Sequence, residues 1–217
     1  ACLGHRKGGV AMAAIGACAG FGAICGSSLA TAATMGKVAL PELRRLGYSG
    51  ALSTGTLAAG GTLGILIPPS VILIIYSILT EQNIAKMFLA AFIPGILAAL
   101  GYILAIALYV RFVKDSGPTK DRVGWKERLS LFKNIWQIIL IFLVMIGGIY
   151  LGWFTPTEGG AIGAGGAGLI AISNKNFKFK DLVEVIESTA ITSAMIFLVL
   201  LGAEFFNSFI ALTQLPN

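Results

Sequence analysis

GAICGSSLATAATMG, residues 22–36, is the stretch on which the predicted fold depends. It is apolar and rich in Gly, Ala, Ser and Thr, and basic residues flank it on both sides: His5, Arg6 and Lys7 before it, and Lys37, Arg44 and Arg45 after it. Basic residues of membrane proteins collect on the cytoplasmic side, so a single crossing should carry them mainly at one end. A segment that enters the bilayer, turns and returns would carry them at both ends. The flanks therefore favour a re-entrant hairpin.

The length of this segment also fits a hairpin. Residues 10–36 would form about 40 Å of helix at about 1.5 Å per residue, whereas two full crossings need about 40 residues. Two half-length helices that meet near the bilayer centre fit, with the tip at Cys25-Gly26-Ser27-Ser28. Irregular backbone at that depth is tolerated only where it is buried in protein or lines a cavity. We therefore expect the hairpin to carry a polar site.

The composition predicts an all-α integral membrane protein that crosses the bilayer several times. Of its 217 residues, 56% are hydrophobic and only 12% are charged, whereas soluble domains carry about 25% charged residues. The net charge of +6 is spread over the loops between apolar segments, so no nucleic-acid partner is predicted, and contact with anionic lipid remains open. The three cysteines, Cys2, Cys18 and Cys25, form no CxxC pair, which argues against a disulfide framework or a metal site.

A second break is predicted in the apolar segment of residues 51–80. Its middle, GGTLGILIPPS over residues 60–70, holds three glycines and two adjacent prolines. Proline lacks the backbone N–H and restricts the residue before it. This stretch should therefore not form a continuous helix, and we expect a span broken at mid-membrane.

The remaining segments complete the predicted topology. We expect a first re-entrant hairpin over 1–46, a broken transmembrane helix over 47–83, a transmembrane helix over 84–114, a cytoplasmic amphipathic connector over 115–134, a transmembrane helix over 135–154 and two further spans within 155–217. In the connector, Trp125, Leu129 and Phe132 share a face, which is typical of an interfacial helix; an ordinary solvated loop helix is the alternative. A short amphipathic segment, 181–187, should precede the last span. This threading places every Lys and Arg except Lys86 on one side.

The hairpin tip and the broken span together carry groups that could bind an ion and a substrate. Unwound backbone exposes carbonyl oxygens that can bind Na⁺, and half-helix N-termini favour anions. Ser27, Ser28, Thr31 and Thr34 add hydroxyls. In membrane helices such hydroxyls also bond to their own backbone or join helices, an alternative that applies most to Thr34.

Two glutamates are further candidates. Glu158 follows Thr-Pro-Thr and should lie in the first turn of a helix, where capping explains it as well as function does. Glu204 lies inside the last predicted span, where an ionisable residue is by default a functional hypothesis, although an interfacial role is also open. The sequence holds no Ser/His/Asp set, phosphate loop or metal-ligand cluster, so no enzymatic activity is predicted.

Three motifs in order, GSSLATAATMG, GGTLGILIPPS and TPTEGGAIGA, resemble the large membrane subunit of TRAP transporters, the DctM-like permeases. The resemblance implies Na⁺-coupled uptake of an organic anion, such as a C4-dicarboxylate or sialic acid, across the bacterial inner membrane. It also implies two partners: a small DctQ-like membrane subunit and a periplasmic substrate-binding protein. The implied architecture is an inverted-repeat, elevator-type transporter.

The resemblance also implies site residues. A Na⁺ site would lie between the hairpin tip and the broken span, with Ser27 and the backbone of Gly64, Ile67 and Pro69 as ligands. The position of Cys25 is commonly serine in such tips, and its backbone carbonyl would serve equally. The implied substrate-binding residues around the tip are Gly26, Ser28, Thr31 and Thr62.

The third motif resembles the start of a second, inverted repeat, so 155–217 would be that repeat, truncated before its own hairpin. The chain would then be about half of a permease, and we expect that it would not transport alone. Two other classes remain open: a channel or a non-TRAP ion or organic-anion transporter with a similar re-entrant loop, and a membrane scaffold or assembly protein.

Overall fold

The computed structural model describes residues 6–113, 116–119, 125–173 and 177–213, with the backbone alone for 125–135. All regular elements in these ranges are helices, which confirms the predicted all-α class: α1 Gly9–Cys25, α2 Ser28–Arg45, α3 Gly50–Leu66, α4 Val71–Leu79, α5 Ile84–Phe112, α6 Trp125–Tyr150, α7 Pro156–Ser173 and α8 Phe179–Thr213. Among them, α5 and α8 are long and apolar enough to cross a membrane, and α3 with α4 forms a further candidate span bent by 42°. The chain divides into two compact units, Ala1–Gly166 and Ala167–Asn217.

Helices α1 and α2 form the two arms of the hairpin. Gly26 ends α1 in the left-handed region (φ 65°) and donates its N–H to the Gly22 carbonyl. Ser27 then adopts an extended conformation and caps α2 by accepting a hydrogen bond from the N–H of Ala30. This break lies at the expected tip, and it combines a glycine that tolerates positive φ with a serine that caps the next helix.

The arms are longer than the sequence indicated. They contain 17 and 18 residues, and α2 runs through Pro41 to Arg45, within the predicted hairpin bounds of 1–46. A proline inside a helix removes one hydrogen bond, but Leu43, 1% exposed, anchors the following turn in the core. That buried contact offsets the loss and carries the helix past the proline.

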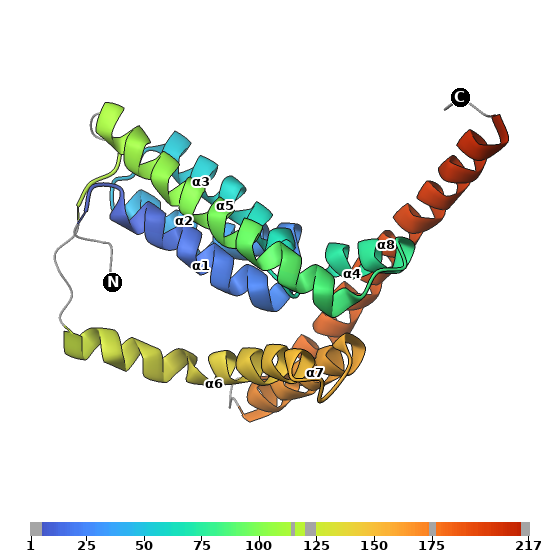
Figure 1. Cartoon of the computed structure of the whole chain (residues 1–217). Helices are drawn as coiled ribbons and strands as arrows, with labels where there is room; N and C mark the ends of the chain where they lie inside the picture. The colour runs from blue at the N-terminus through green and yellow to red at the C-terminus, as the bar shows by residue number, and fades with distance from the viewer. Residues whose placement is uncertain (1–5, 114–115, 120–124, 174–176, 214–217) are drawn as a thin grey trace. The chain divides into compact units, whose positions relative to one another are not determined.

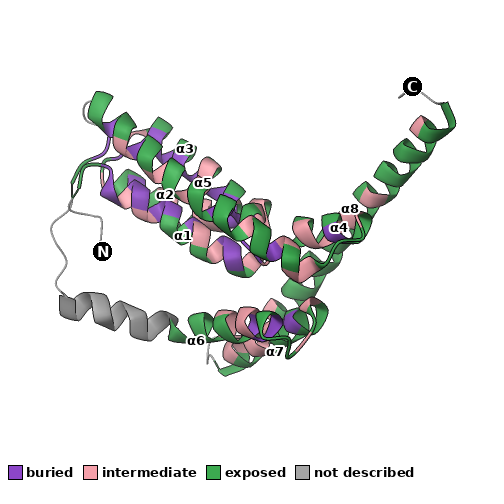
Figure 2. Cartoon of the chain, viewed as in Figure 1, coloured by how far each residue is buried: buried purple, intermediate pink, exposed green. Residues whose placement is uncertain are grey.

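Helix α3 packs between the two arms through its glycines. A Cβ atom on Gly60 would lie 2.7 Å from the sulfur of Cys18 on α1, and one on Gly61 would lie 2.7 Å from the Cβ of Ala32 on α2. Helices α1, α2, α3 and α5 lie side by side (Figure 1). Buried residues are frequent on α1 and α3, whereas much of α5 is exposed (Figure 2).

The predicted break of the second span is confirmed, and it lies at the prolines instead of at the three glycines. Helix α3 continues through all of them to Leu66, and the chain breaks only at Pro68-Pro69 before α4. Glycine costs about 1 kcal/mol in a helix relative to alanine, and here the missing side chains permit close packing that offsets this cost. Helix α5 also approaches the break, because a Cβ on Gly95 would lie 3.1 Å from the Leu66 carbonyl oxygen.

The later part of the chain is more continuous than predicted. Residues 125–150 form the single helix α6, instead of a connector over 115–134 followed by a separate span. The predicted amphipathic face of Trp125, Leu129 and Phe132 lies outside the described side chains. Met145 of α6 contacts α7 at Gly163. The segment 181–187 is likewise part of α8, because no proline or glycine separates it from the apolar residues that follow.

We predict that Gly22→Ala destabilises the protein, because a Cβ there would lie 2.6 Å from the Cα of Gly64. Forcing a methyl group into a packed core costs about 1–3 kcal/mol. Gly20→Ala is the matched control, since a Cβ at Gly20 meets nothing within 4 Å and alanine favours the helix. Thermal unfolding of the purified protein in detergent measures both. Equal melting temperatures for the two variants would show that α1 and α3 are not in backbone contact.

Candidate functional site

The two chain breaks meet. The carbonyl of Gly26 at the hairpin tip accepts a hydrogen bond from the N–H of Val71, the first residue of α4 (3.3 Å). A Cβ on Gly26 would lie 3.0 Å from the carbonyl oxygen of Pro69. The position therefore suits glycine for two reasons: the positive φ and the close backbone of the second break. Ser27 and Pro69, two of the predicted ion ligands, are thereby brought into one region.

Carbonyl groups without helical donors lie beside this junction. In a continuous helix, the N–H groups of residues 68 and 69 would bind the carbonyls of Gly64 and Ile65, but both positions are proline and have no N–H. Gly64 also faces the hairpin directly, because a Cβ on it would lie 2.7 Å from the Ser27 carbonyl oxygen. The structure thus places Gly64, which the family resemblance implies as an ion ligand, against the tip.

Four helix termini converge here. The C-terminal ends of α1 and α3 bring partial negative charge, and the N-terminal ends of α2 and α4 bring partial positive charge. Both N-termini are capped by serine: Ser27 accepts from Ala30 N–H (3.4 Å) and Ser70 from Leu73 N–H (3.5 Å). Ser70 is fully buried. Sequence reasoning missed Ser70, although a serine directly after two prolines and before an apolar run is an N-cap signal.

Not all predicted hydroxyls are available to a ligand. Thr31 is fully buried, and its hydroxyl donates to the Ser27 carbonyl (2.7 Å), which also accepts the backbone N–H of Thr31 (3.0 Å). Thr31 therefore uses its hydroxyl to hold the tip, which is the alternative that sequence reasoning had kept open. Ser28 and Thr34 are partly exposed on the same helix.

Thr62 lies on an exposed part of α3. Its hydroxyl bonds to the Ala59 carbonyl (2.7 Å) and pairs with the phenol of Tyr102 on α5 (2.9 Å). Because the threonine hydrogen is directed to Ala59, the Tyr102 hydroxyl donates to Thr62. Thr62 thus joins α3 to α5. Tyr102 carries no signal in the sequence, since it is an isolated tyrosine in an apolar helix.

The other predicted ligands lie beside the junction. The Cys25 sulfhydryl lies 3.8 Å from the Ser27 carbonyl oxygen, and Ile67 is an extended, nearly buried residue that ends α3. No cluster of three or more His, Cys, Asp or Glu side chains that could hold a metal is found among the described residues. A cation at this junction would therefore be held by carbonyl and hydroxyl oxygens.

The two glutamates are not part of the junction's hydrogen bonds. Glu158 accepts hydrogen bonds from both the N–H (2.7 Å) and the hydroxyl (3.0 Å) of Thr155, whose hydroxyl in turn accepts the Glu158 N–H (3.3 Å). This reciprocal pattern is a capping box and accounts for the T-x-x-E of the third motif. Glu204 lies exposed on α8, in the second compact unit.

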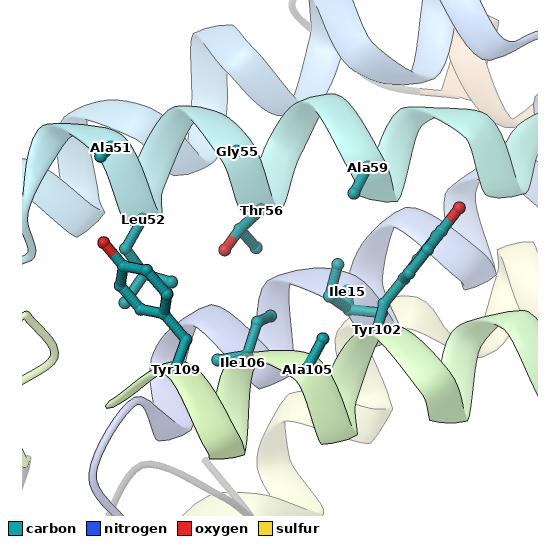
Figure 3. A pocket seen from close by; sticks show the side chains of 10 residues that line it. All are labelled: Ile15, Ala51, Leu52, Gly55, Thr56, Ala59, Tyr102, Ala105, Ile106 and Tyr109. Atoms are coloured by element: carbon teal, nitrogen blue, oxygen red, sulfur yellow. The ribbon is translucent and has the colours of Figure 1, made fainter. Parts of the chain in front are cut away.

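A separate cavity of about 290 Å³ lies between α1, α3 and α5 (Figure 3). Its lining is apolar apart from one threonine and two tyrosines: Ile15, Ala51, Leu52, Gly55, Thr56, Ala59, Tyr102, Ala105, Ile106 and Tyr109. The buried Thr56 hydroxyl points into it, and no hydrogen-bond partner for it occurs among the described residues. With no cationic side chain in its wall, this cavity is poorly suited to an organic anion.

Comparison with known proteins identifies the family. The family described as the tripartite ATP-independent periplasmic transporter, DctM component, matches residues 1–217. The chain belongs to this family. It is 36% identical to the C4-dicarboxylate TRAP transporter large permease protein DctM of Pseudomonas aeruginosa, an alignment that covers 100% of this chain and 51% of that protein.

Relatives named for other substrates match over a similar range. The sialic acid TRAP transporter permease protein SiaT of Haemophilus influenzae is 35% identical over 98% of this chain and 34% of its own length. The ectoine TRAP transporter large permease protein TeaC of Halomonas elongata is 30% identical over 99% of this chain and 50% of its own length. The chain therefore spans about half, or less, of each of these DctM-family relatives.

We predict that Glu158→Gln leaves transport by the complete protein unchanged. Glutamine can replace glutamate in a capping box, because its amide oxygen can accept the same two hydrogen bonds from Thr155. Glu158→Ala, which removes the acceptor, should lower the melting temperature by an amount equivalent to about 1 kcal/mol. Initial uptake rates and thermal unfolding measure the two effects. A large loss of uptake in Glu158→Gln with normal stability would instead indicate a functional carboxylate.

Proposed function

We propose that this chain is the part of a TRAP large permease that carries its first re-entrant hairpin and a Na⁺ site, and that the complete protein couples Na⁺ entry to uptake of an organic acid. The observation that carries the proposal is the junction of the two chain breaks. There Gly26 contacts Pro69, and Ser27 contacts Gly64.

Several features of the junction support Na⁺ as the coupling ion. Unwound backbone and half-helix C-termini coordinate Na⁺ in other transporters with discontinuous helices. The prolines free the Gly64 and Ile65 carbonyls for that role, and the hydroxyl of Ser27 lies at the adjoining tip. The Ser27 carbonyl already accepts two hydrogen bonds from Thr31. We therefore assign the Ser27 contribution to its side chain, with the carbonyls of Gly64, Ile67, Pro69 and Cys25 as further ligands.

The organic acid would bind on the positive side of the same junction. The N-termini of α2 and α4 favour an anion, and Gly26 and Ser28 lie at the first of them. Thr31 and Thr62 already have hydrogen-bond partners, so we assign them supporting roles. The names of the relatives differ in substrate, which limits the proposal to a small organic acid.

We also propose the rest of the assembly, and this part of the proposal rests on membership of the family. The complete permease would be a multi-pass protein of the bacterial inner membrane, would work with a small membrane subunit, and would receive its substrate from a periplasmic binding protein. An elevator-type movement of the unit that contains the hairpin would carry the site across the membrane.

The test uses the complete transporter reconstituted in vesicles with its binding protein. Replacing external Na⁺ with choline should abolish uptake. Ser27→Ala should raise the Na⁺ concentration for half-maximal uptake about tenfold, because it removes one oxygen ligand of the ion. A hydrogen bond to a charged group, a contact of comparable kind, contributes about 1.5–3 kcal/mol.

The control for the lost cap is Asn83→Ala. Asn83 caps α5 with a similar contact, accepting from Lys86 N–H at 3.1 Å, and it belongs neither to the junction nor to the base of the hairpin. It should leave the Na⁺ dependence unchanged. Uptake that persists in choline under a proton gradient alone would refute Na⁺ coupling. Equal effects of the two variants would mean that Ser27 acts only as a cap.

A further inference from the structure

The base of the hairpin is closed by a short segment that follows α5. Three successive carbonyls of this segment, which we call the strap (residues 116–118), accept hydrogen bonds from three different places. Ser116 accepts from Ser49 N–H (3.1 Å), Gly117 from Gly8 N–H (3.1 Å) and Pro118 from the Tyr48 hydroxyl (3.0 Å). The donors belong to the entry of α1, the exit of α2 and the N-cap of α3, so the strap joins all three to the end of α5.

The strap is packed at backbone contact distance. A Cβ on Gly117 would lie 3.0 Å from the Cα of Gly8 and 3.0 Å from a methyl group of Val110 on α5. Gly8 has a φ of 71°, and a Cβ on it would lie 2.8 Å from the same valine. Ser116 is 2% exposed, and its hydroxyl donates to the Val113 carbonyl at the end of α5 (2.8 Å). An open surface loop would leave these groups exposed to water.

Tyr48 is the side chain that connects the strap to both arms. Its position is set by the end of α2: Gly47, with a φ of 80°, donates to the Arg44 carbonyl, and Tyr48 donates its N–H to the Leu43 carbonyl, a Schellman motif. The Tyr48 hydroxyl accepts the Val10 N–H (3.1 Å) and donates to Pro118. It thereby satisfies a first-turn N–H of α1 that has no partner within its own helix. Burial raises the pKa of this phenol further above its ordinary value of about 10, so the hydroxyl is protonated and can donate at neutral pH.

We propose that the strap is a lock on the base of the hairpin, and that Tyr48 is its positioning residue. The lock holds α1, α2, α3 and α5 as one body throughout the transport cycle, so the hairpin does not open from its base. It also sets the distance between the arms, and so keeps the tip against the break at Pro68-Pro69. In this second respect the inference rests on the proposed Na⁺ site at the tip.

Loosening the base should therefore lower the fraction of molecules in which the tip is assembled. The apparent affinity for a ligand falls by that same fraction, whereas the maximal rate returns when the ligand is saturating. This pattern separates a positioning role from simple misfolding, which would reduce the amount of active protein and hence the maximal rate.

The first experiment compares Tyr48→Phe with Tyr76→Phe in the complete transporter. Tyr48→Phe keeps the ring and removes the hydroxyl. The Val10 N–H and the Pro118 carbonyl then lose their hydrogen-bond partner. Tyr76, on α4, is 54% exposed and is the matched control. The first measurement is the rate at which a membrane-permeant maleimide labels Cys18, a fully buried α1 residue that faces Gly60 of α3, followed by peptide mass spectrometry.

In Tyr48→Phe, Cys18 should be labelled about tenfold faster than in Tyr76→Phe, because the Val10 N–H and the Pro118 carbonyl lose their shared hydrogen-bond partner and the base opens locally more often. The Na⁺ concentration for half-maximal uptake should rise severalfold with the maximal rate retained. Equal labelling rates in the two variants would overturn the lock. The labelling requires neither Na⁺ nor substrate. Faster labelling in a transporter with no Na⁺ dependence would therefore refute the proposed coupling and leave the lock in place.

The second experiment closes the base covalently. Ser49→Cys and Ser116→Cys are combined in a complete transporter in which every native cysteine is replaced, and a short thiol-specific cross-linker is applied. The backbones of these residues already share a hydrogen bond, so a lock that stays closed predicts uptake equal to that of the untreated double variant. Loss of uptake on treatment with a cleavable cross-linker, restored by its cleavage, would show that the base opens during the cycle and would overturn the proposal.

Discussion

The backbone contact between α3 and the two arms of the hairpin is the constraint on which the rest of the structure depends. Gly64 lies so close to Gly22 and Ser27 that a methyl group on it would overlap the Ser27 carbonyl and the Thr31 hydroxyl. In lipid, apolar surface provides little drive for helices to associate, and packing through small residues replaces it. Gly60, Gly61 and Gly64 of α3 therefore permit α1 and α2 to lie so close to it. With α3 packed against both α1 and α2, the hairpin tip reaches Pro69.

The backbone groups left without hydrogen bonds at the junction determine which charge it favours. Each chain break costs helical hydrogen bonds, and the local sequence determines which groups lose them. At the hairpin tip, Gly26 donates its N–H to the Gly22 carbonyl, and the Ser27 side chain accepts the Ala30 N–H. At the second break, two prolines remove donors and leave the carbonyls of Gly64 and Ile65 available. The first break thus caps the helix that follows it, and the second leaves carbonyl oxygens without helical donors, at the side where two helix C-termini already favour a cation.

Local chemistry explains which parts of the fold could be predicted. Glycine and serine at the tip, and two prolines in the second span, have strong conformational preferences that need no tertiary context, and both breaks occur where the sequence indicated. The continuation of α2 through Pro41 could not be predicted, because it depends on burial of Leu43. The same holds for the site. The two breaks that form the junction were predictable from local sequence, whereas the hydrogen bond between Thr62 and Tyr102 was not, because it joins residues 40 positions apart. The strap depends on Tyr48 and Pro118, 70 positions apart, and leaves no periodic signal.

The hairpin is held at both ends by backbone, and this determines what can move. At its base the strap pairs with the hairpin through successive carbonyls, and at its tip Gly26 pairs with Val71. Opening the base would unpair three carbonyls of the strap, and opening the tip would unpair Gly26 and Val71 at a depth where, in the predicted topology, no water replaces their hydrogen bond. Sliding of an arm along α3 is opposed as well, because the glycine contacts hold only in one register. If the junction is carried across a membrane, as proposed, the movement would therefore be least costly with α1, α2, α3 and α5 moving together.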